Sequence, residues 1–173
     1  MLAVSAAGTC GVCASEQEAE AAELSAWHGG SKPFFRLDDL SMARVALASQ
    51  RADVVIVHFF ATWCEPCRDE LPALNRLVAR SDPKRLRVLT ISVAEVDVRV
   101  RTFVEKMPLD FPVLLDRDRS VTKAWKVSAL PTSFILDCSL TPRLFVERDY
   151  EWDRFDPKQF VTDFTPCDGA NSQ

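Results

Sequence analysis

The 173-residue sequence lacks three features that would assign a function class at once. Its longest apolar run falls far short of the roughly 20 residues that a membrane-spanning helix needs, so no span is expected. Basic clusters are absent, and 21 Lys and Arg residues stand against 25 Asp and Glu, which argues against nucleic acid as the natural partner. There is also no internal repeat. With 47% hydrophobic residues, the chain is expected to form one domain with a sizeable core.

The N-terminal region lacks the basic segment that opens an export signal. Residues 1–8 are nevertheless small and apolar, and we interpret them as the remnant of an export signal or anchor, with an unstructured terminus as the alternative. Residues 14–30 are rich in Ala and Glu, which predicts an acidic lead-in outside the main core. The predicted division is a lead-in over residues 1–30 and a folded domain over residues 31–173.

The most informative stretch is Thr-Trp-Cys-Glu-Pro-Cys over residues 62–67, which follows an apolar run over residues 54–61. That run has the length of a strand buried on both faces, as parallel strands beneath helices are. Thr62 and Glu65 have the spacing of a capping box, so a helix is expected to begin here. Cys64 then lies where unpaired backbone N–H groups and the positive end of the helix dipole favour a thiolate.

Cys67 lies one turn further along this helix. It begins a stripe that continues through Leu71, Leu74 and Val78, and this spacing places all four residues on one buried helical face. The spacing therefore predicts an exposed sulfur at the helix start and a second sulfur beneath it, close enough to form a disulfide. This is the geometry of a reversible thiol–disulfide couple, in which Cys64 attacks a partner and Cys67 resolves the mixed disulfide.

The residues from Trp63 to Cys67, the Arg-Asp-Glu-Leu-Pro that follows, and the downstream Leu130-Pro131-Thr132 resemble the thioredoxin-like superfamily. Within it, they are similar to the TlpA, ResA and DsbE (CcmG) group of bacterial extracytoplasmic thiol–disulfide oxidoreductases. The resemblance covers residues 33–164. It implies an α/β, thioredoxin-like fold with a central mixed β-sheet flanked by helices and a TlpA-type strand-and-helix insertion.

The same resemblance implies the partners and the location of the protein. The substrate would be a disulfide-bearing protein, and electrons would come from an upstream protein dithiol, in the family typically a membrane-embedded donor. No cofactor is expected beyond the redox-active Cys64–Cys67 disulfide. The expected location is the periplasm, with a membrane anchor in the full-length form. Cytochrome c maturation, copper-centre assembly and general thiol reduction all fit as the physiological task.

Further site residues follow from the resemblance. Glu70 neighbours Cys67 on the helix and would accept its proton, with a solvated carboxylate as the alternative. Pro131 is expected to be cis, against a low baseline for X–Pro bonds, and would present the backbone of Leu130 to an extended substrate segment. Trp63 would complete the rim of this substrate site.

His58 and Glu65 carry two further expectations. His58 is the only polar residue in the buried strand, where thioredoxins carry an acid and TlpA-like proteins often an asparagine. It is interpreted as a hydrogen-bonded core histidine, with a proton relay to Cys67 as the alternative. Glu65 is adjacent to Cys64 and opposes the helix dipole, so the thiolate is expected to be less stabilised than in oxidising relatives. This predicts a low reduction potential and a reductant.

The rest of the chain predicts alternating elements. Strands are expected over residues 34–37, 86–93, 111–115, 132–136 and 144–148, and helices over residues 42–50, 96–106, 120–125 and from residue 156 onward. The helix that carries both cysteines should end near Arg80. The strand–helix–strand order over residues 86–115 predicts a parallel pairing, and the last two strands predict an antiparallel hairpin.

Three alternatives use the same cysteines differently. Cys10 and Cys13 have zinc-ligand spacing, but fifty residues lie between them and the second pair, which argues against a shared zinc site. A peroxidase of the peroxiredoxin type would need Pro-x-x-x-Thr-x-x-Cys, whereas Val57 stands seven residues before Cys64. A metal chaperone or binding module would use the pair as ligands.

The other two cysteines leave the disulfide pattern open. Cys138 and Cys167 could pair with each other, or Cys167 could pair with Cys10 or Cys13, and free thiols are equally compatible. Six cysteines in all are too few for a disulfide-dense scaffold, yet more than a cytosolic protein needs.

Overall fold

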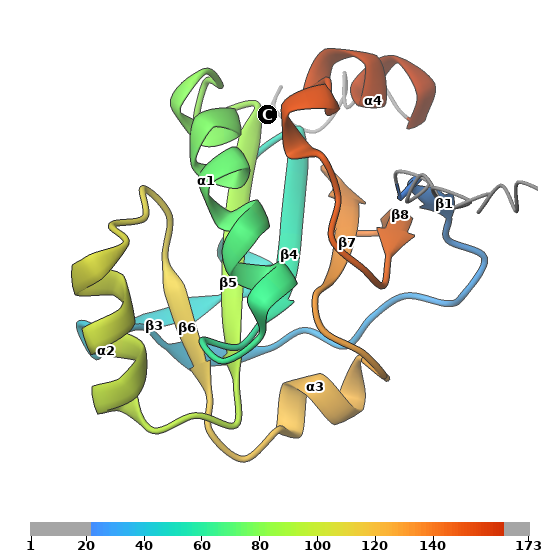
Figure 1. Cartoon of the computed structure of the whole chain (residues 1–173). Helices are drawn as coiled ribbons and strands as arrows, with labels where there is room; N and C mark the ends of the chain where they lie inside the picture. Colours follow the sequence, from blue (N-terminus) through green and yellow to red (C-terminus); the bar gives the residue numbers. More distant parts are fainter. Residues whose placement is uncertain (1–21, 165–173) are drawn as a thin grey trace, which may run out of the picture.

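A six-stranded mixed sheet forms the centre of the computed structural model, which describes residues 22–164 (Figure 1). The strand order is β1-β8-β7-β4-β5-β6. The strands span Ser25–Ala26 (β1), Val54–Phe60 (β4), Leu86–Val93 (β5), Val113–Asp116 (β6), Thr132–Asp137 (β7) and Pro142–Val146 (β8). A separate two-stranded ribbon joins β2 (Arg36–Asp38) to β3 (Arg44–Ala46).

The strand β4 lies at the centre of the sheet, between β5 and β7. All seven of its residues are buried, because β5 pairs with it on one side and β7 on the other while both faces of the sheet are covered. Since successive side chains of a strand point to opposite faces, Val54 and Ile56 belong to one core and Val55 and Val57 to a second. The apolar run is thus explained by burial on both faces, as predicted.

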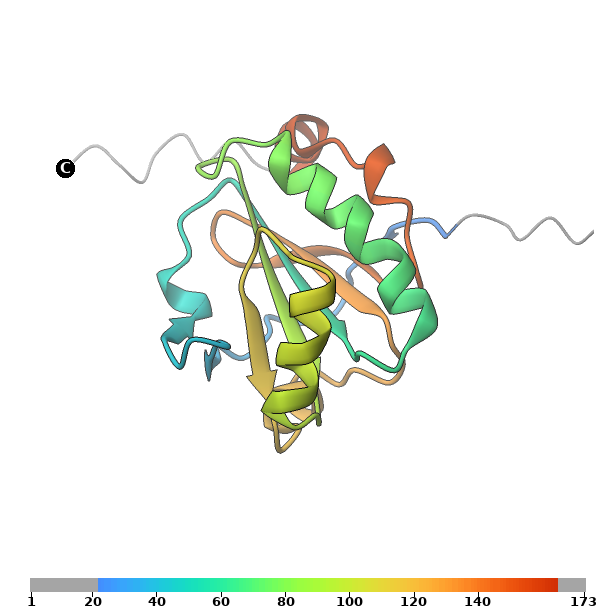
Figure 2. The same cartoon turned by 60° about the vertical axis from the view of Figure 1, so that its left-hand side comes forward.

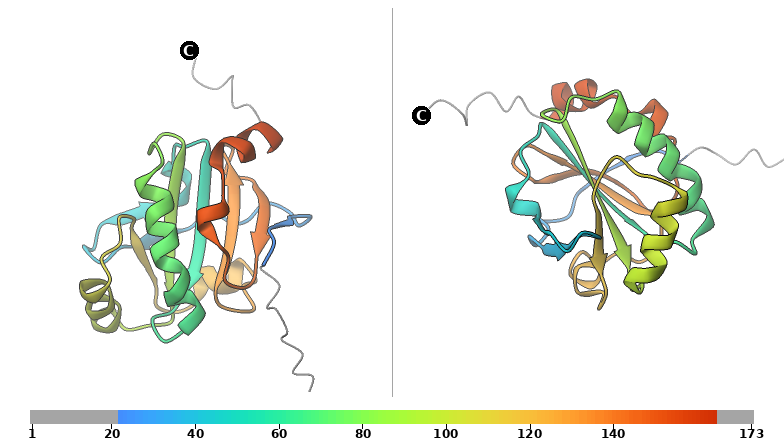
Figure 3. Two further views of the ribbon diagram at one scale, coloured as in Figure 1. Left: turned by 45° about the horizontal axis from the view of Figure 1, so that its top comes forward. Right: turned by 90° about the vertical axis from the view of Figure 1, so that its left-hand side faces the viewer.

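Helices cover the first of these faces. They are α1 (Glu65–Ala79), α2 (Asp97–Lys106) and α4 (Pro157–Phe164), and the short 3-10 turn η2 (Trp152–Arg154) packs beside them. The opposite face is covered by α3 (Ser120–Ala124), the β2–β3 ribbon and the 3-10 turn η1 (Leu47–Ser49). Figure 2 and the right panel of Figure 3 show α1, α2 and α4 on one side of the sheet and the ribbon on the other.

The pairings match the predicted α/β, thioredoxin-like arrangement. β4, β5 and β6 are parallel, and α2 connects β5 to β6. β7 and β8 form the antiparallel hairpin, and β7 also pairs antiparallel with β4, so the sheet is mixed. Within residues 22–164, no helix is both long and apolar enough to cross a membrane.

Two predictions about the N-terminal half are wrong in part. The helix expected over residues 42–50 is the strand β3 followed by η1, because Val45 pairs with Leu37 across the ribbon. The lead-in assigned to residues 1–30 contains β1, which pairs with β8, and Trp27 packs edge-on against Phe134. The described end of this segment therefore belongs to the sheet, and the predicted signal remnant lies outside the described residues.

Smaller differences concern the ends of elements. β6 and β8 are each displaced by about two residues from their expected bounds, whereas β5 and the end of α1 agree with the prediction. The helix expected from Val96 begins one residue later, because Val96 is the N-cap of α2, and its side chain is exposed. The inward face of α2 is provided by Val100, with Phe103 and Val104 partly buried.

Candidate active site

The site lies where β4 ends and α1 begins. Cys64 is the N-cap of α1, and its sulfur accepts a hydrogen bond from the backbone N–H of Cys67 at 3.3 Å. The two cysteines form a disulfide, with Cα atoms 5.3 Å apart, so their predicted proximity is confirmed. In the dithiol form, a Cys64 thiolate at this position would accept the same hydrogen bond from the Cys67 N–H. The partial positive charge of the helix N-terminus would stabilise it further.

The two sulfurs differ in accessibility in the expected order. Cys67 is 0% exposed and Cys64 is 6% exposed, so Cys64 is more buried than the predicted exposed thiol. The neighbouring Trp63 is 65% exposed and stands beside the disulfide at the surface. Leu71 and Leu74 are fully buried below Cys67, which confirms the inward stripe of α1.

The predicted capping box is wrong, because Thr62 has another partner. Its backbone N–H donates to the carboxylate of Glu95 at 2.8 Å, and its hydroxyl donates to the same group. Glu95 is 7% exposed and also accepts from the hydroxyl of Ser92 at 2.9 Å. Since Glu95 follows β5, which runs parallel to β4, it fixes the loop that carries Trp63 and Cys64.

Glu70 lies one turn after Cys67 and faces the interior rather than solvent. It is 5% exposed, and its Oε2 accepts hydrogen bonds from the backbone N–H of Tyr150 at 2.9 Å and from the indole N–H of Trp152 at 2.8 Å. Burial raises the pKa of Glu70 to about 8, although both hydrogen bonds act in the opposite direction. A carboxyl group with this pKa can hold or release a proton near neutral pH.

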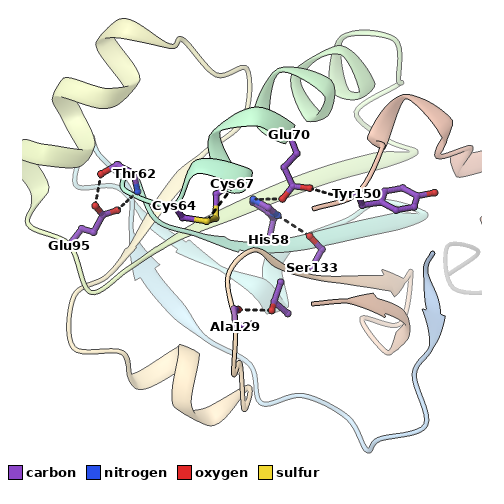
Figure 4. Close-up of a disulfide and its surroundings, with 10 residues drawn as sticks. His58, Thr62, Cys64, Cys67, Glu70, Glu95, Ala129, Ser133 and Tyr150 are labelled. Atoms are coloured by element: carbon purple, nitrogen blue, oxygen red, sulfur yellow. Dashed lines mark hydrogen bonds and ion pairs between the residues drawn. A yellow bond between two sulfur atoms is a disulfide. The ribbon is translucent and has the colours of Figure 1, made fainter. Parts of the chain in front are cut away.

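His58, on β4, faces Glu70, on α1. Its Nδ1 is 2.8 Å from the hydroxyl of Ser133, so the predicted hydrogen-bonded core histidine is confirmed. Its Nε2 lies 3.6 Å from Oε1 of Glu70, and complete burial lowers the pKa of His58 to about 3. Figure 4 shows Glu70 directed toward His58 and His58 directed toward Ser133, beside the disulfide.

An open groove of about 470 Å³ begins at Trp63, the residue before Cys64. Trp63 and Leu130 line it together with Ala129, Val127 and Arg119. The Leu130–Pro131 bond is cis, as predicted from the resemblance. Within residues 22–164, no hydrogen bond occupies the backbone N–H or carbonyl of Leu130. The structure therefore brings Trp63, Leu130 and Pro131 together, while their role in binding a substrate stays a prediction.

The remaining cysteines do not form a second centre among the described residues. Cys138 is disulfide-bonded. The sequence leaves open how the other cysteines pair, and Cys10, Cys13 and Cys167 lie outside the described residues. Across residues 22–164, no group of three or more His, Cys, Asp and Glu side chains is placed to hold a metal ion.

Comparison with known proteins identifies the family. A family model described as "AhpC/TSA family" matches residues 29–141, which is more than half of the chain. The chain belongs to the AhpC/TSA family. This match spans the elements from β2 to β7, including the two cysteines of α1 and the segment Leu130-Pro131.

Relatives of this AhpC/TSA chain agree with the predicted resemblance, which is confirmed. The thiol-disulfide oxidoreductase ResA of Bacillus thuringiensis subsp. konkukian is 33% identical over 109 residues. The alignment covers 63% of this chain and 63% of ResA, so the chain spans less than two thirds of the length of that relative.

Solved structures share the fold of this AhpC/TSA protein. A proposed thiol:disulfide interchange protein DsbE from Chlorobium tepidum has a TM-score of 0.69 and 25% identity, with 82% of this chain and 98% of the other covered. A secreted disulfide oxidoreductase of Mycobacterium tuberculosis, described as homologous to E. coli DsbE, has a TM-score of 0.60 and 21% identity, with 74% and 92% covered. The thioredoxin-like fold class is therefore confirmed.

Two contributors to the site were missed by the sequence analysis. The position of Glu95 near the site could have been inferred, because it follows a predicted strand whose parallel neighbour leads into the cysteine motif. The position of Ser133 could not, since its importance depends on the antiparallel register that places it opposite His58.

Proposed function

We propose that this protein is a thiol–disulfide oxidoreductase that reduces disulfides of other proteins in the periplasm. The observation that carries the proposal is the Cys64–Cys67 disulfide at the start of α1, in which Cys64 follows the groove residue Trp63 and Cys67 is fully buried one turn before Glu70. The similarity to ResA supports the activity, and the secreted Mycobacterium neighbour supports a location outside the cytoplasm.

The chemistry runs in two exchange steps. The Cys64 thiolate attacks one sulfur of the target disulfide, and the second target sulfur leaves as a thiolate that takes a proton from solvent. Cys67 then gives its proton to Glu70 and attacks the Cys64 sulfur, which breaks the mixed disulfide and releases the target sulfur that Cys64 had bound, as a thiolate that takes a proton from solvent. Two electrons have passed to the target, and the oxidised pair seen here is the product. An upstream protein dithiol would reduce it again, without a further cofactor.

The groove supplies a place for the target chain. An extended segment beside Leu130 would find a free backbone N–H and carbonyl and could pair with them as an added strand does. Trp63 would cover the segment from the other side, since both residues line the same groove. A role in cytochrome c maturation or in copper-centre assembly would then depend on which protein presents its disulfide here.

The activity is tested by reduction of insulin in the presence of dithiothreitol. We expect the protein to accelerate the precipitation of insulin chains and to consume no hydrogen peroxide under the same conditions, because the peroxidase motif is absent before Cys64. Peroxide consumption without insulin reduction would instead assign a peroxidase. Tight zinc or copper binding without insulin reduction would assign a metal chaperone.

The direction of electron flow is a separate prediction. Glu65 is the first residue of α1, directly after Cys64, so its carboxylate opposes the stabilisation of a thiolate by the helix start. We expect a low potential, as a reductant requires. The measurement is equilibration with glutathione redox buffers, in which the tryptophan fluorescence of the protein reports the oxidised fraction. A potential well above about −200 mV would place the protein among the oxidants and contradict the proposal of a reductant.

A further inference from the structure

The polar cluster beneath the disulfide contains two buried atoms that face each other without a hydrogen bond. Within the described residues, Nε2 of His58 and Oε1 of Glu70 are the buried side-chain nitrogen and oxygen atoms that lack a partner. They lie 3.6 Å apart, and both side chains are almost completely buried. Since an unpaired buried polar atom costs free energy, a proton shared across this gap is the arrangement that satisfies both.

Two arrangements place a proton between these atoms, and they differ in the charge of Glu70. If Glu70 is protonated, its O–H donates to Nε2, and His58 carries its own proton on Nδ1 and donates to Ser133. If Glu70 is ionised, His58 carries its proton on Nε2 and donates to the carboxylate, while the Ser133 hydroxyl donates to Nδ1. The imidazole is neutral in both, as its complete burial favours.

We propose that His58 acts as a tautomer switch that, together with Ser133, keeps Glu70 hydrogen-bonded both as a carboxylic acid and as a carboxylate. A serine hydroxyl can donate or accept, so the same three side chains satisfy either charge state once Nε2 and Oε1 close their 3.6 Å gap to hydrogen-bond length. His58 is thus a positioning residue that acts through Glu70. The inference rests on the proposed function, because the switch serves the proton that Cys67 releases during disulfide exchange.

The proton balance of the exchange fits this switch. When Cys67 gives up its proton and bonds to Cys64, Glu70 gains that proton, and the His58 proton relocates from Nε2 to Nδ1. When the disulfide is reduced again, Glu70 returns the proton and the imidazole reverts. Oε2 of Glu70 stays bound to Tyr150 and Trp152 in both states, so only Oε1 changes its role.

Several titratable groups share a surface groove with Glu70. This groove, of about 260 Å³, is lined by Glu70 and by the following titratable groups: Asp69 on α1, Asp149, Tyr150 and Glu151 after β8, and Asp153 on η2. Asp149 acts on Glu70 through its negative charge and opposes ionisation. No cation among the described residues forms an ion pair with Glu70, so His58 is its one side-chain partner that can change protonation.

The test begins with the oxidised wild-type protein, which has only two histidines to observe. Nitrogen NMR of the imidazole rings distinguishes the two neutral tautomers. We expect His58 to carry its proton on Nδ1 at pH 6 and on Nε2 at pH 9.5, with Glu70 changing from acid to carboxylate over the same interval. In Glu70→Gln the His58 tautomer should no longer depend on pH. A single tautomer at both pH values in the wild type overturns the proposal.

Insulin reduction by His58 variants supplies the functional readout. His58→Leu removes the partner of Oε1, and we expect about a tenfold loss of rate at pH 7 together with an upward displacement of the pH profile. His58→Gln places an amide that donates or accepts near the position of Nε2 and should restore most of the rate. His28→Asn, at an exposed position, is the matched control.

The outcomes separate this inference from the proposed function. A folded His58→Leu variant with the wild-type rate and pH profile overturns the switch and leaves the oxidoreductase intact. A wild-type protein that does not reduce insulin overturns the proposed function, whereas the tautomer measurement still decides whether the switch exists. If His58→Leu fails to fold, the wild-type NMR result alone is decisive.

Discussion

A Cys67→Ala variant is expected to accumulate mixed disulfides with its target proteins through Cys64. The wild-type intermediate is short-lived, because the Cys67 sulfur lies within bonding distance of Cys64 and displaces the target. Alanine removes that nucleophile and leaves Cys64 at the helix start, directly after the groove residue Trp63. Turnover with insulin should fall to the level without protein.

The captured complexes are measured on non-reducing gels, and the proteins released by a reductant are identified by mass spectrometry. Cys64→Ala is the matched control, since it keeps the fully buried Cys67 but removes the more exposed of the two cysteines. Cys138 is the same in both variants and cannot account for a difference between them. Capture of the same proteins by both variants would show that the bond to the target does not form at Cys64. Capture by Cys64→Ala alone would reverse the assigned roles.

The centre of the fold could be predicted because local pattern and burial agree there. Residues 54–60 form one apolar run around His58, and residues 86–93 form a second run of strand length, so each predicts a buried strand without reference to the other. The helix that follows the first strand is predicted by the stripe from Cys67 to Leu74. These elements hold the disulfide, which is why its position was foreseen.

The edges of the fold could not be predicted in the same way. Residues 42–50 contain Val45 and Leu47, which suit a short helix or a short strand, and only the pairing with Leu37 decides between them. The two residues of β1 are too few for any pattern, and their register against Phe145 follows from the hairpin that receives them. At such positions tertiary pairing determines the local structure.

The surroundings of Glu70 show the same limit within the site. Its place one turn after Cys67 was readable from the sequence, but its hydrogen bonds to Tyr150 and Trp152 join positions about eighty residues apart. The sequence therefore identified the carboxylate and could not show that it is buried, which is what changes its chemistry. The same holds for Ser133, which reaches His58 through the register of β7 on β4.

The stability of the oxidised protein is expected to depend on pH through this buried pair. The pKa of Glu70 is about 8 in the folded protein, against an ordinary value of 4.5. Between pH 4.5 and 8 the folded state therefore holds one more proton than the unfolded state, so the free energy of unfolding falls as pH rises. The pKa of His58 is about 3 when folded against an ordinary 6.5, so the unfolded state holds the extra proton and stability rises with pH. Between pH 4.5 and 6.5 the two slopes cancel.

The free energy of unfolding is therefore expected to rise from pH 3 to 4.5, to stay constant up to pH 6.5 and to fall from there to pH 8. Each limb amounts to about 2 kcal/mol, because one proton contributes about 1.4 kcal/mol per pH unit. Urea unfolding of the oxidised protein at these pH values provides the measurement. In Glu70→Gln, which keeps an acceptor for Tyr150, the falling limb should disappear and the rise should continue to pH 6.5, whereas His58→Asn should lose the rising limb. Curves for wild type and Glu70→Gln that run parallel above pH 6.5 would show that Glu70 is ionised throughout, and the buried carboxylic acid would then have to be abandoned.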